Sequence, residues 1–525
     1  MARHGSGIEG KRFIAWAALM GVASGAVFLG VAELIACLFA RTASPILAVG
    51  SFVIDIVPQP LKEFAIATFG EDDKVVLLGS LGLAVVIASA LGGGLQLIRP
   101  PLGVAVVLLA GALATAATVT RTGGSPLGFL PPVVGAIAGA VLLLILARRL
   151  RAWRDGAGTG SQRSTPGSAV DRRQFFLIAG ISSVAAIAVG VGARVTSAAT
   201  ASLEAIRDAL QLPTPNSTVT IPDGAELDVE GVSPLFTPNE DFYRVDTALT
   251  VPEVDPETWT LVIDGMVDER VELTFQDLLD MGVDEYAITL TCVSNEVGGG
   301  LVGNAKWLGV PIRDVLAMAG VQDGADMVLS TSVDGYTAST PLEAVTDENR
   351  DAILAIAMNG EPLPLEHGFP VRMVVPGLYG YVSATKWVTE LTVTTFADDE
   401  AYWTPRGYSA EAPIKFSSRV DTPKSGTPVT AGTVPIAGMA WAQTVGIDRV
   451  EVSIDDGDWQ QATLSTAVND DTWVQWFLEW QAEPGTHYIA VRAVNKAGET
   501  QIEERAPIAP DGSAGWHRPL ITVTG

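Results

Sequence analysis

Cysteine and histidine are both scarce in this chain. Its 525 residues include 2 cysteines and 4 histidines. Cys37 lies inside an apolar run, so Cys292 is the single thiol of the second half and no disulfide framework can form there. The histidines are His4, His367, His487 and His517. So few imidazoles exclude most zinc and di-iron ligand sets.

Positive charge is also in short supply. The sequence has 33 lysines and arginines against 59 aspartates and glutamates, which gives a formal net charge of -26. A protein that binds nucleic acid needs a basic face for the phosphate backbone. The basic residues here gather mainly in short stretches beside apolar runs, a pattern typical of membrane topology. We therefore expect no nucleic-acid partner.

Long apolar runs fill the first part of the chain. Five of them are long enough to cross a bilayer as helices, namely 13–40, 75–98, 102–120, 127–147 and 175–193. The stretch 45–57 is shorter and carries Asp55, so we expect an interfacial or re-entrant segment there. Glu33 is the one acid within a predicted span, and it is either a functional carboxyl or a residue packed near a helix end. Membrane lipid is an expected partner.

The arginines predict the orientation of these spans. The connection after the fourth run holds Arg148, Arg149, Arg151, Arg154, Arg163, Arg172 and Arg173. That connection is expected to be cytoplasmic, and five crossings then leave everything after residue 197 outside the cytoplasm. The segment 171–177, Asp-Arg-Arg-Gln-Phe-Phe-Leu, resembles a twin-arginine export signal, although positive-inside flanking explains it equally well. We expect a multi-pass protein of the cell membrane.

The second half reads as two further domains after a linker. Prolines among small and polar residues favour a linker over 198–235. Alternating runs at 259–263 and 286–290 and a helical stretch at 311–318 predict an α+β domain over 236–420. From about residue 425 only strands follow, at 450–454, 473–480 and 488–494, which suits an immunoglobulin-like β-sandwich over 421–525. With a membrane domain over 1–197, the prediction is a multi-domain chain.

The predicted sandwich contributes many of the chain's tryptophans. We expect core packing, rather than recognition, as the use of Trp441, Trp459, Trp473, Trp476 and Trp480.

Cys292 stands where a predicted strand ends. It is followed by Val-Ser-Asn-Glu-Val-Gly-Gly-Gly at 293–300, a flexible loop rich in accessible backbone. A thiol at such a position is either a buried structural cysteine or a ligand at a site. A thiolate is a soft ligand for a transition metal, and a metal that brings further ligands of its own needs no histidine beside it.

Four motifs in order resemble the sulfite oxidase family of molybdenum-cofactor oxidoreductases. They are Pro-Asn-Glu-Asp-Phe-Tyr-Arg at 238–244, Thr-Cys at 291–292 with Gly-Asn-Ala-Lys-Trp-Leu-Gly at 303–309, His-Gly-Phe-Pro-Val-Arg at 367–372, and Gly-Trp-His-Arg at 515–518. The resemblance runs from about residue 233 to the end of the sequence. It implies a molybdopterin-binding enzyme of the membrane-anchored bacterial type, with an N-terminal helical transmembrane bundle, a sulfite-oxidase-like α+β domain and a C-terminal immunoglobulin-like domain used for dimerisation.

The resemblance also implies roles for individual residues. Cys292 would be the metal ligand and a catalytic residue together with Tyr379 and Arg244. The cofactor-binding residues would be Asn239, Phe242, Tyr243, His367, Arg372, Ser383 and Lys386. Arg372 offers a planar fork for the pterin's phosphate, with His367, Ser383 and Lys386 as further donors. An ordinary surface ion pair is the alternative for Arg372 and Lys386, and core packing is the alternative for Phe242.

The expected cofactor is molybdenum-molybdopterin. No haem is expected in this chain, because none of the apolar runs contains a histidine. The substrate would be a small oxyanion or an S-oxide, with Arg244, Arg406 and Tyr379 available near the metal. A separate electron-transfer partner is needed, and a homodimer through the sandwich or a monomer both fit the sequence. The alternatives are a sulfoxide reductase of the same family and a non-catalytic membrane-attached binding or assembly module.

Overall fold

The computed structural model describes residues 5–39, 44–58, 73–120, 127–158 and 198–525, together with positions 61, 68, 69, 177 and 180. The chain divides into two compact units, residues 1–201 with 248–250 and residues 202–247 with 251–525. Each unit is described separately below.

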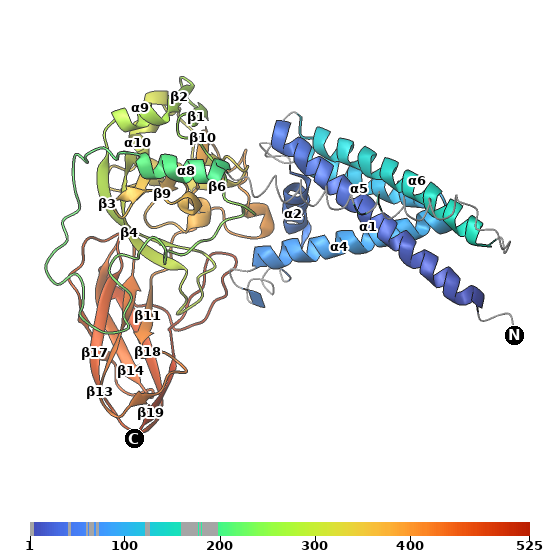
Figure 1. Ribbon diagram of the computed structural model, residues 1–525. Helices are drawn as coiled ribbons and strands as arrows, with labels where there is room; N and C mark the ends of the chain where they lie inside the picture. The colour runs from blue at the N-terminus through green and yellow to red at the C-terminus, as the bar shows by residue number, and fades with distance from the viewer. Residues whose placement is uncertain are drawn as a thin grey trace. The chain divides into compact units, whose positions relative to one another are not determined.

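The first unit is helical (Figure 1). Its helices are α1 (Gly5–Phe39), α2 (Pro45–Ile56), α4 (Asp73–Ile98), α5 (Leu102–Val119) and α6 (Leu130–Gly158). In the described part of the chain, α1, α4, α5 and α6 are long and apolar enough to cross a membrane. These helices confirm four of the five apolar runs, and the fifth predicted run, 175–193, lies outside the described residues except for positions 177 and 180.

Small residues let these helices pack closely. The Cα atoms of Gly21 on α1 and Gly93 on α4 face the neighbouring backbone so closely that a methyl group on either would overlap it. On the opposite side, Gly139 of α6 would clash with the backbone of Ser24 if it carried a side chain. Such close approach is typical of helices that associate in lipid, where apolar side chains gain little from contact with each other.

Helix α2 is too short to span a bilayer. It has 12 residues, which is about 18 Å of helix. Ser44 caps the first turn of this helix, because its hydroxyl accepts a hydrogen bond from the Leu47 amide. The same hydroxyl donates a hydrogen bond to the Glu33 carboxylate of α1 at 2.8 Å. The Ile46 amide also donates to Glu33, at 3.3 Å. Glu33 of α1 is therefore buried and holds the start of α2.

The second unit begins within α8 (Ala198–Ala209) and then runs without regular elements to β1. Leu203 of α8 belongs to the buried core of this unit, so the segment predicted as a linker is packed onto the domain over its first turns. The mixed part contains β1 (Thr260–Gly265), β2 (Val271–Thr274), α9 (Phe275–Asp280), β3 (Asp284–Thr291), β4 (Val302–Pro311), α10 (Ile312–Ala319), β5 (Met327–Ser332), β6 (Thr337–Pro341), α11 (Leu342–Thr346), β7 (Ile353–Met358), β8 (Glu361–Pro362), η3 (Leu365–His367), β9 (Arg372–Val374), η4 (Gly380–Val382), β10 (Val388–Thr394) and η5 (Thr404–Arg406).

Two sheets organise the mixed part. One has the order β2-β1-β10-β5-β6, and the other has the order β3-β4-β7-β8 with β9 paired to β7. Strand β3 pairs with β4 in antiparallel register from Asp284 opposite Gly309 to Thr291 opposite Val302. Thr289, Leu290 and Thr291 are buried. Cys292 therefore follows directly on the buried end of β3. The expected strands at 259–263 and 286–290 and the helix at 311–318 correspond to β1, β3 and α10.

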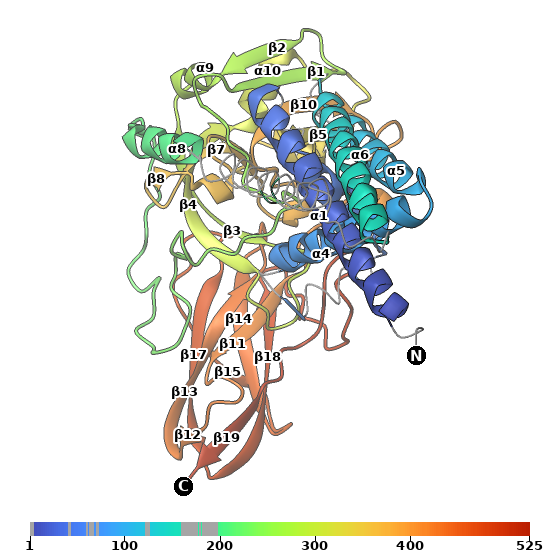
Figure 2. The same ribbon diagram turned by 45° about the vertical axis from the view of Figure 1, so that its right-hand side comes forward.

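The last part contains strands without helices in 417–525, a stretch that the structure describes throughout. These strands are β11 (Ser417–Thr422), β12 (Val429–Thr430), β13 (Gly432–Trp441), β14 (Ile447–Ile454), β15 (Gln460–Gln461), β16 (Thr463–Leu464), β17 (Val474–Ala482), β18 (Gly485–Asn495) and β19 (Leu520–Thr524). They form two sheets, β11-β13-β17-β16 and β12-β19-β18-β14-β15, and Figure 2 shows them running alongside each other.

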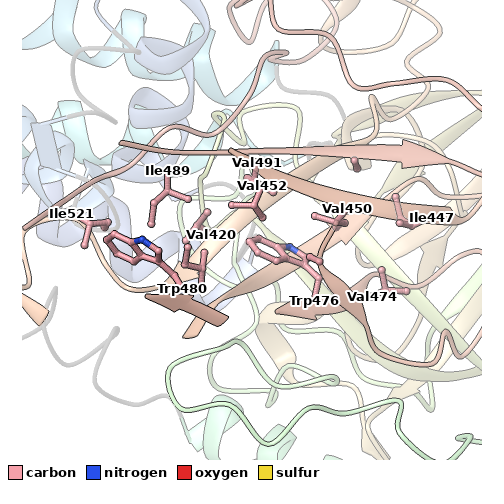
Figure 3. Packing of buried hydrophobic residues seen from close by; sticks show 14 of the residues in the cluster. Val420, Ile447, Val450, Val452, Val474, Trp476, Trp480, Ile489, Val491 and Ile521 are labelled. Carbon is pink, nitrogen blue, oxygen red and sulfur yellow. The ribbon is translucent and has the colours of Figure 1, made fainter. Parts of the chain in front are cut away.

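The two sheets share one apolar core. Trp476 and Trp480 of β17 lie between the sheets, against Val452 of β14 and Val491 of β18 (Figure 3). Trp441 and Trp473 are also buried, which confirms the expected use of these four indoles. Trp459 differs: it is partly exposed and packs edge-on against Trp516 at 4.9 Å, outside this core.

Candidate functional site

Cys292 follows directly on β3 and is buried. Its amide donates to the Leu301 carbonyl at 2.9 Å, which closes the base of the loop 293–300. The Ser294 amide donates to the Cys292 Sγ atom at 3.4 Å. Burial raises the pKa of the thiol, and the Ser294 hydrogen bond acts in the opposite direction. The sulfur is thus buried but accepts an N–H donor, which suits an atom that carries negative charge when a metal binds.

The segment 239–244 lies against the His367 motif. The Phe242 ring is buried and stacks on Tyr243 at 5.2 Å, and it meets His367 edge-on at 5.7 Å. The His367 Nε2 atom lies 3.2 Å from the Asn239 carbonyl, which identifies this nitrogen as the N–H donor. Burial lowers the pKa of His367 to about 3, so the ring is neutral at physiological pH. Two motifs far apart in the sequence therefore form one wall of a site.

Arg372 is a buried cation on β9. Its guanidinium donates to the carbonyls of Met373 and His367, at 3.3 and 3.2 Å, and lies 5.1 Å from the centre of the Trp307 ring. In the described part of the chain no carboxylate lies within ion-pair distance of it. Burial lowers the pKa of Arg372 to about 10. A guanidinium buried without an anion is costly, so this position fits an anionic ligand group.

Lys386 and Arg244 converge on one carboxylate. The Lys386 Nζ atom lies 2.6 Å from Asp246 Oδ2, and the Arg244 Nε atom lies 3.1 Å from the same oxygen. Lys386 is buried, and burial lowers the pKa of its amine to about 8 despite the neighbouring carboxylate. Arg244 is 38% exposed at its side chain. Together with Arg372, these side chains leave an excess of positive charge on this side of the site.

The electrostatics of Tyr243 involve both Cys292 and Arg372. Burial raises the pKa of its phenol well above the usual range. The charge of a Cys292 thiolate acts in the same direction, and the Arg372 guanidinium opposes it. The phenol is therefore within electrostatic reach of both Cys292 and Arg372. That the sulfur and the buried cation serve one site stays a prediction of the sequence motifs.

Three of the expected site residues are already engaged by the protein. Ser383 donates its hydroxyl proton to the carbonyls of Leu378 and Tyr379, so that proton is not directed at a ligand. The Asn239 amide donates to the Met358 carbonyl at 3.3 Å and accepts from Asn359 at 2.8 Å. The Tyr379 hydroxyl accepts from the Lys415 amide. Burial raises the pKa of Tyr379 to about 12, and Cys292 contributes in the same direction, so this phenol also lies near the sulfur.

Tyr336 was not expected from the sequence but lies near Cys292. Burial raises the pKa of its phenol well above the usual range, and the Cys292 charge is the next contribution. Its hydroxyl donates to the Tyr381 carbonyl at 2.8 Å. Tyr336 stands in the turn between β5 and β6, where Asp334 and Gly335 precede it. The sequence indicates only that Tyr336 directly follows an Asp-Gly turn between two strands. A turn alone does not indicate which other parts of the chain lie near it, so the sequence could not place this phenol beside Cys292.

These residues fit a metal that arrives with its own ligands. No cluster of three or more histidine, cysteine or acidic side chains that could hold a metal ion occurs among the described residues. Cys292 offers one soft ligand, and Arg372 offers a buried cation to an anionic part of the same group. In addition, the buried hydroxyls of Thr291 and Ser332 have no hydrogen-bond partner within the described chain. A ligand with polar atoms would satisfy such groups.

Comparisons with known proteins identify the class of the site. Residues 248–403 match the oxidoreductase molybdopterin binding domain, and this range contains Cys292, His367, Arg372 and Lys386. The chain is therefore an oxidoreductase that binds molybdopterin. It is 30% identical over 349 residues to sulfite oxidase from Gallus gallus, covering 57% of this chain and 75% of the relative. It belongs to the sulfite oxidase family, and its cofactor is molybdenum-molybdopterin.

Other relatives share only part of their length with this chain. Mitochondrial sulfite oxidase from Mus musculus is 32% identical over 349 residues, covering 57% of this chain and 63% of that protein. The chain thus spans a little less than two thirds of that relative. The solved structure of the sulfane dehydrogenase SoxCD from Paracoccus pantotrophus is 23% identical, with a TM-score of 0.46, over 57% of this chain and 82% of that one.

Proposed function

We propose that the chain is a membrane-anchored oxidoreductase whose second unit works outside the cytoplasm and moves an oxygen atom to or from a small oxyanion. The observation that carries the proposal is the shared neighbourhood of Cys292 and Arg372, a buried thiol and a buried cation without an acidic partner among the described residues. When bound, the cofactor supplies a metal that exchanges an oxygen atom together with two electrons.

The side chains divide into cofactor and substrate roles. Cys292 is the proposed metal ligand. Arg372, His367 and Lys386 hold the anionic end of the pterin, with Ser383 fixing the backbone between them through its bonds to Leu378 and Tyr379. Asn239, Phe242 and Tyr243 line the pterin. The remaining proposed assignments are catalytic and comprise Arg244, Tyr379 and Tyr336.

The charge of the site supports an anionic substrate. Arg244 and Lys386 share the single carboxylate of Asp246, so one positive charge is left over beside that of Arg372. An anion is attracted to such a concentration of positive charge in a protected site. Arg244, whose side chain is 38% exposed, is the proposed contact for the oxyanion.

A second candidate function is reduction of an S-oxide. Its specific support is the loop 293–300, which carries Glu296 and no basic residue, together with the pairing of Arg244 to Asp246. Both features reduce the positive charge that an oxyanion would meet next to the metal ligand. Reduced positive charge would weaken the binding of a charged sulfite more than the binding of a neutral sulfoxide.

Four long apolar helices support the membrane anchor. Arginines in the last turns of α6 and in the connection that follows favour the cytoplasmic side for that end, and five crossings, the last over 175–193, would carry the second unit outside. The proposed domains are 1–197 in the membrane, 198–235 as the lead-in, 236–420 for the cofactor and 421–525 as an immunoglobulin-like sandwich. The sandwich is a candidate homodimer surface, and a separate protein is the proposed electron partner.

The two candidate functions differ in the direction of electron flow. The detergent-solubilised full chain, loaded with cofactor, should oxidise sulfite to sulfate with water as the oxygen source, and the two electrons released should reduce an oxidised dye. A sulfoxide reductase would instead consume electrons from a reduced dye and release water and a thioether. Cys292→Ser should abolish either reaction, whereas Cys37→Ser, the matched thiol control in α1, should leave it unchanged. A metal-loaded protein inactive in both assays contradicts both functions.

A further inference from the structure

The loop that follows Cys292 is held from outside its own domain. The Ser513 hydroxyl donates to the Asn295 carbonyl at 2.6 Å, and the Arg419 Nη1 atom donates to the Gly299 carbonyl at 2.8 Å. Both donors belong to the strand-rich part that begins at β11. Two carbonyls of an eight-residue loop are thus fixed by side chains more than 100 positions further along the chain.

A third contact is steric. Gly298 has a φ of +81°, and its Cα faces the His517 ring so closely that a methyl group there would overlap the Cδ2 and Nε2 atoms of the imidazole. The ring itself is fixed, because its Nδ1 atom accepts the Val420 amide at 3.1 Å. The loop therefore rests on a flat, oriented surface at the position where it lacks a side chain.

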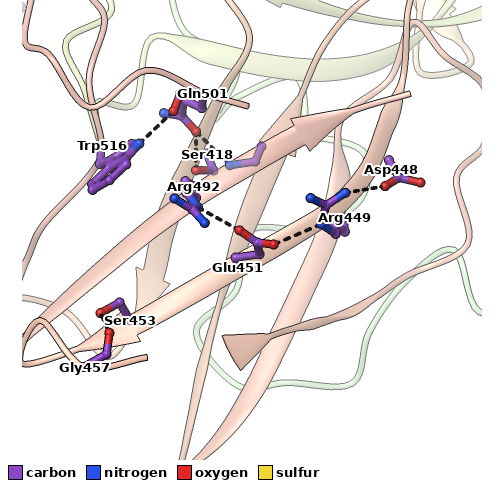
Figure 4. Close-up of polar contacts among 10 residues, drawn as sticks. Ser418, Asp448, Arg449, Glu451, Ser453, Gly457, Arg492, Gln501 and Trp516 are labelled. Atoms are coloured by element: carbon purple, nitrogen blue, oxygen red, sulfur yellow. Dashed lines mark hydrogen bonds and ion pairs between the residues drawn. The ribbon is translucent and has the colours of Figure 1, made fainter. Parts of the chain in front are cut away.

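The segment that carries Ser513 and His517 is itself anchored to the sandwich. Gln501 accepts the Ser418 hydroxyl at 2.7 Å and donates to the Gly515 carbonyl at 3.0 Å, and Trp516 donates to the Gln501 carbonyl at 2.8 Å (Figure 4). Arg419 is buried and paired with Asp421 at 2.6 Å. The Arg419 side chain and the segment that carries Ser513 and His517 are therefore tied to the sandwich by these contacts.

The strand that leads to Cys292 is held by the same part of the chain. Strand β3 is the edge of its sheet, and its Thr289 amide donates to the Asp471 carbonyl at 3.0 Å. The Trp473 amide donates to the Thr289 hydroxyl at 2.9 Å, and the Asn469 side chain donates to the Ala287 carbonyl at 2.9 Å. The sandwich thus fixes both the strand before the sulfur and the loop after it.

We propose that Ser513, Arg419 and His517 are positioning residues that set the direction of the Cys292 sulfur toward the metal. This inference rests on the proposed role of Cys292 as ligand. A thiolate ligand must present its lone pairs at a fixed angle, and a glycine-rich loop cannot fix that angle by itself. The sandwich supplies the missing constraint. Its contribution to the reaction is therefore independent of any role in dimer formation.

The test uses the full chain in detergent and two readouts besides activity. Hydrogen exchange of the amides in 293–300 is measured in the cofactor-free protein, and the electron paramagnetic resonance spectrum of the one-electron-reduced molybdenum is measured in the loaded protein. In His517→Ala and Ser513→Ala we expect the loop amides to exchange about tenfold faster. We also expect a shifted or broadened molybdenum spectrum, at unchanged metal content. His487→Ala, the other histidine of the sandwich, should match the wild type in both measurements.

Gly298→Ala adds a double-variant test. Alone, its methyl group should displace the loop and shift the spectrum. In a His517→Ala background the ring is absent, so the further shift caused by Gly298→Ala should be smaller. Gly498→Ala introduces a side chain at a φ of +84° where no atom lies within 4 Å, and it controls for backbone strain without overlap.

Two outcomes would overturn the inference. One is wild-type exchange and spectra in both His517→Ala and Ser513→Ala, even if their melting temperatures fall, since that result assigns a purely structural role. The other is equal and additive effects of Gly298→Ala in both backgrounds. Failure of the proposed function itself would be seen separately, as a molybdenum spectrum in Cys292→Ser that is unchanged from that of the wild type.

Discussion

Arg372 gives the most direct physical reason for an anionic ligand. The residue is 5% exposed, and its guanidinium has no acidic partner in the described part of the chain. We expect Arg372→Met to lower the molybdenum content at least about tenfold while leaving the cofactor-free protein as stable as the wild type or more so. Removing an unpaired buried charge relieves its desolvation cost. Metal analysis combined with thermal unfolding checks both parts, and a variant that loses stability but keeps molybdenum contradicts the assignment.

His367 predicts a specific acid sensitivity. Burial lowers its pKa from 6.5 to about 3, so the unfolded chain binds a proton between these values that the folded chain does not. Folding stability is therefore complete above pH 6.5 and falls as the pH drops toward 3. The loss between pH 6.5 and 5 is at most about 2 kcal/mol from this residue.

The comparison with His367→Gln isolates this contribution. Glutamine keeps an N–H donor for the Asn239 carbonyl but does not titrate. The free energy of unfolding of the cofactor-free variant should lose less on acidification than that of the wild type. Tryptophan fluorescence reports mainly the second unit, because 10 of the 12 tryptophans lie in 202–525. Parallel pH profiles for the two proteins would argue against a neutral, buried His367.

Single residues can be selected from the sequence where a motif carries them, and their roles stay predictions. The order of Cys292 and the His-Gly-Phe-Pro-Val-Arg motif predicts one shared site, and the charges of Cys292 and Arg372 both act on the pKa of Tyr243. Tyr336 and His517 could not be found this way, because their closeness to Cys292 and Gly298 depends on how distant segments pack. The engagement of the Ser383 hydroxyl by two carbonyls is likewise a property of the folded loop.

At the scale of elements, periodicity predicted the strands and long helices well. The expected strands at 450–454, 473–480 and 488–494 correspond to β14, β17 and β18. The segment 198–235 was less predictable. Its prolines indicate irregular backbone, which is present after α8, but the burial of Leu203 depends on a core formed by strands far along the chain. Composition cannot show whether such a segment is packed or free.

The junction of α1 and α2 gives a prediction for the membrane unit. Glu33 accepts hydrogen bonds from Ser44 and Ile46, and Cys37 lies one turn further along α1. Glu33→Ala should weaken this junction by about 1 to 2 kcal/mol, since the cap loses its acceptor. A thiol reagent should then label Cys37 faster in detergent. Glu33→Gln, which keeps an acceptor, should label at nearly the wild-type rate, and equal rates in all three proteins would contradict a capping role.

At the scale of the whole molecule, charge is divided unevenly along the chain. Residues 202–525 contain 50 acidic and 17 basic residues, whereas residues 1–201 contain 9 and 16. The second unit is thus strongly acidic. We propose that its electron partner is cationic, because opposite charge speeds encounter.

Ionic strength tests this proposal without knowledge of the partner. The rate of electron exchange between the reduced enzyme and a small cationic dye should fall as salt rises from 0.01 to 0.2 M, while the rate with an anionic dye should rise. Screening shortens the reach of both attractions and repulsions from about 30 Å to below 10 Å over this range. Stopped-flow measurement with each dye shows whether the rate of electron exchange falls or rises with salt. The same salt dependence for both would show that the site exchanges electrons without influence from the surface charge.

X-ray absorption at the molybdenum edge of the purified full chain tests the central assignment most directly. The native protein and Cys37→Ser should show the same number of sulfur ligands on molybdenum, and Cys292→Ser should be folded and show one sulfur ligand fewer, because a hydroxyl oxygen replaces the soft thiolate. Circular dichroism of the variant confirms that it is folded. A folded native protein without molybdenum, or a Cys292→Ser protein whose molybdenum keeps every sulfur ligand of the wild type, would show that the sulfur of Cys292 does not bind the metal.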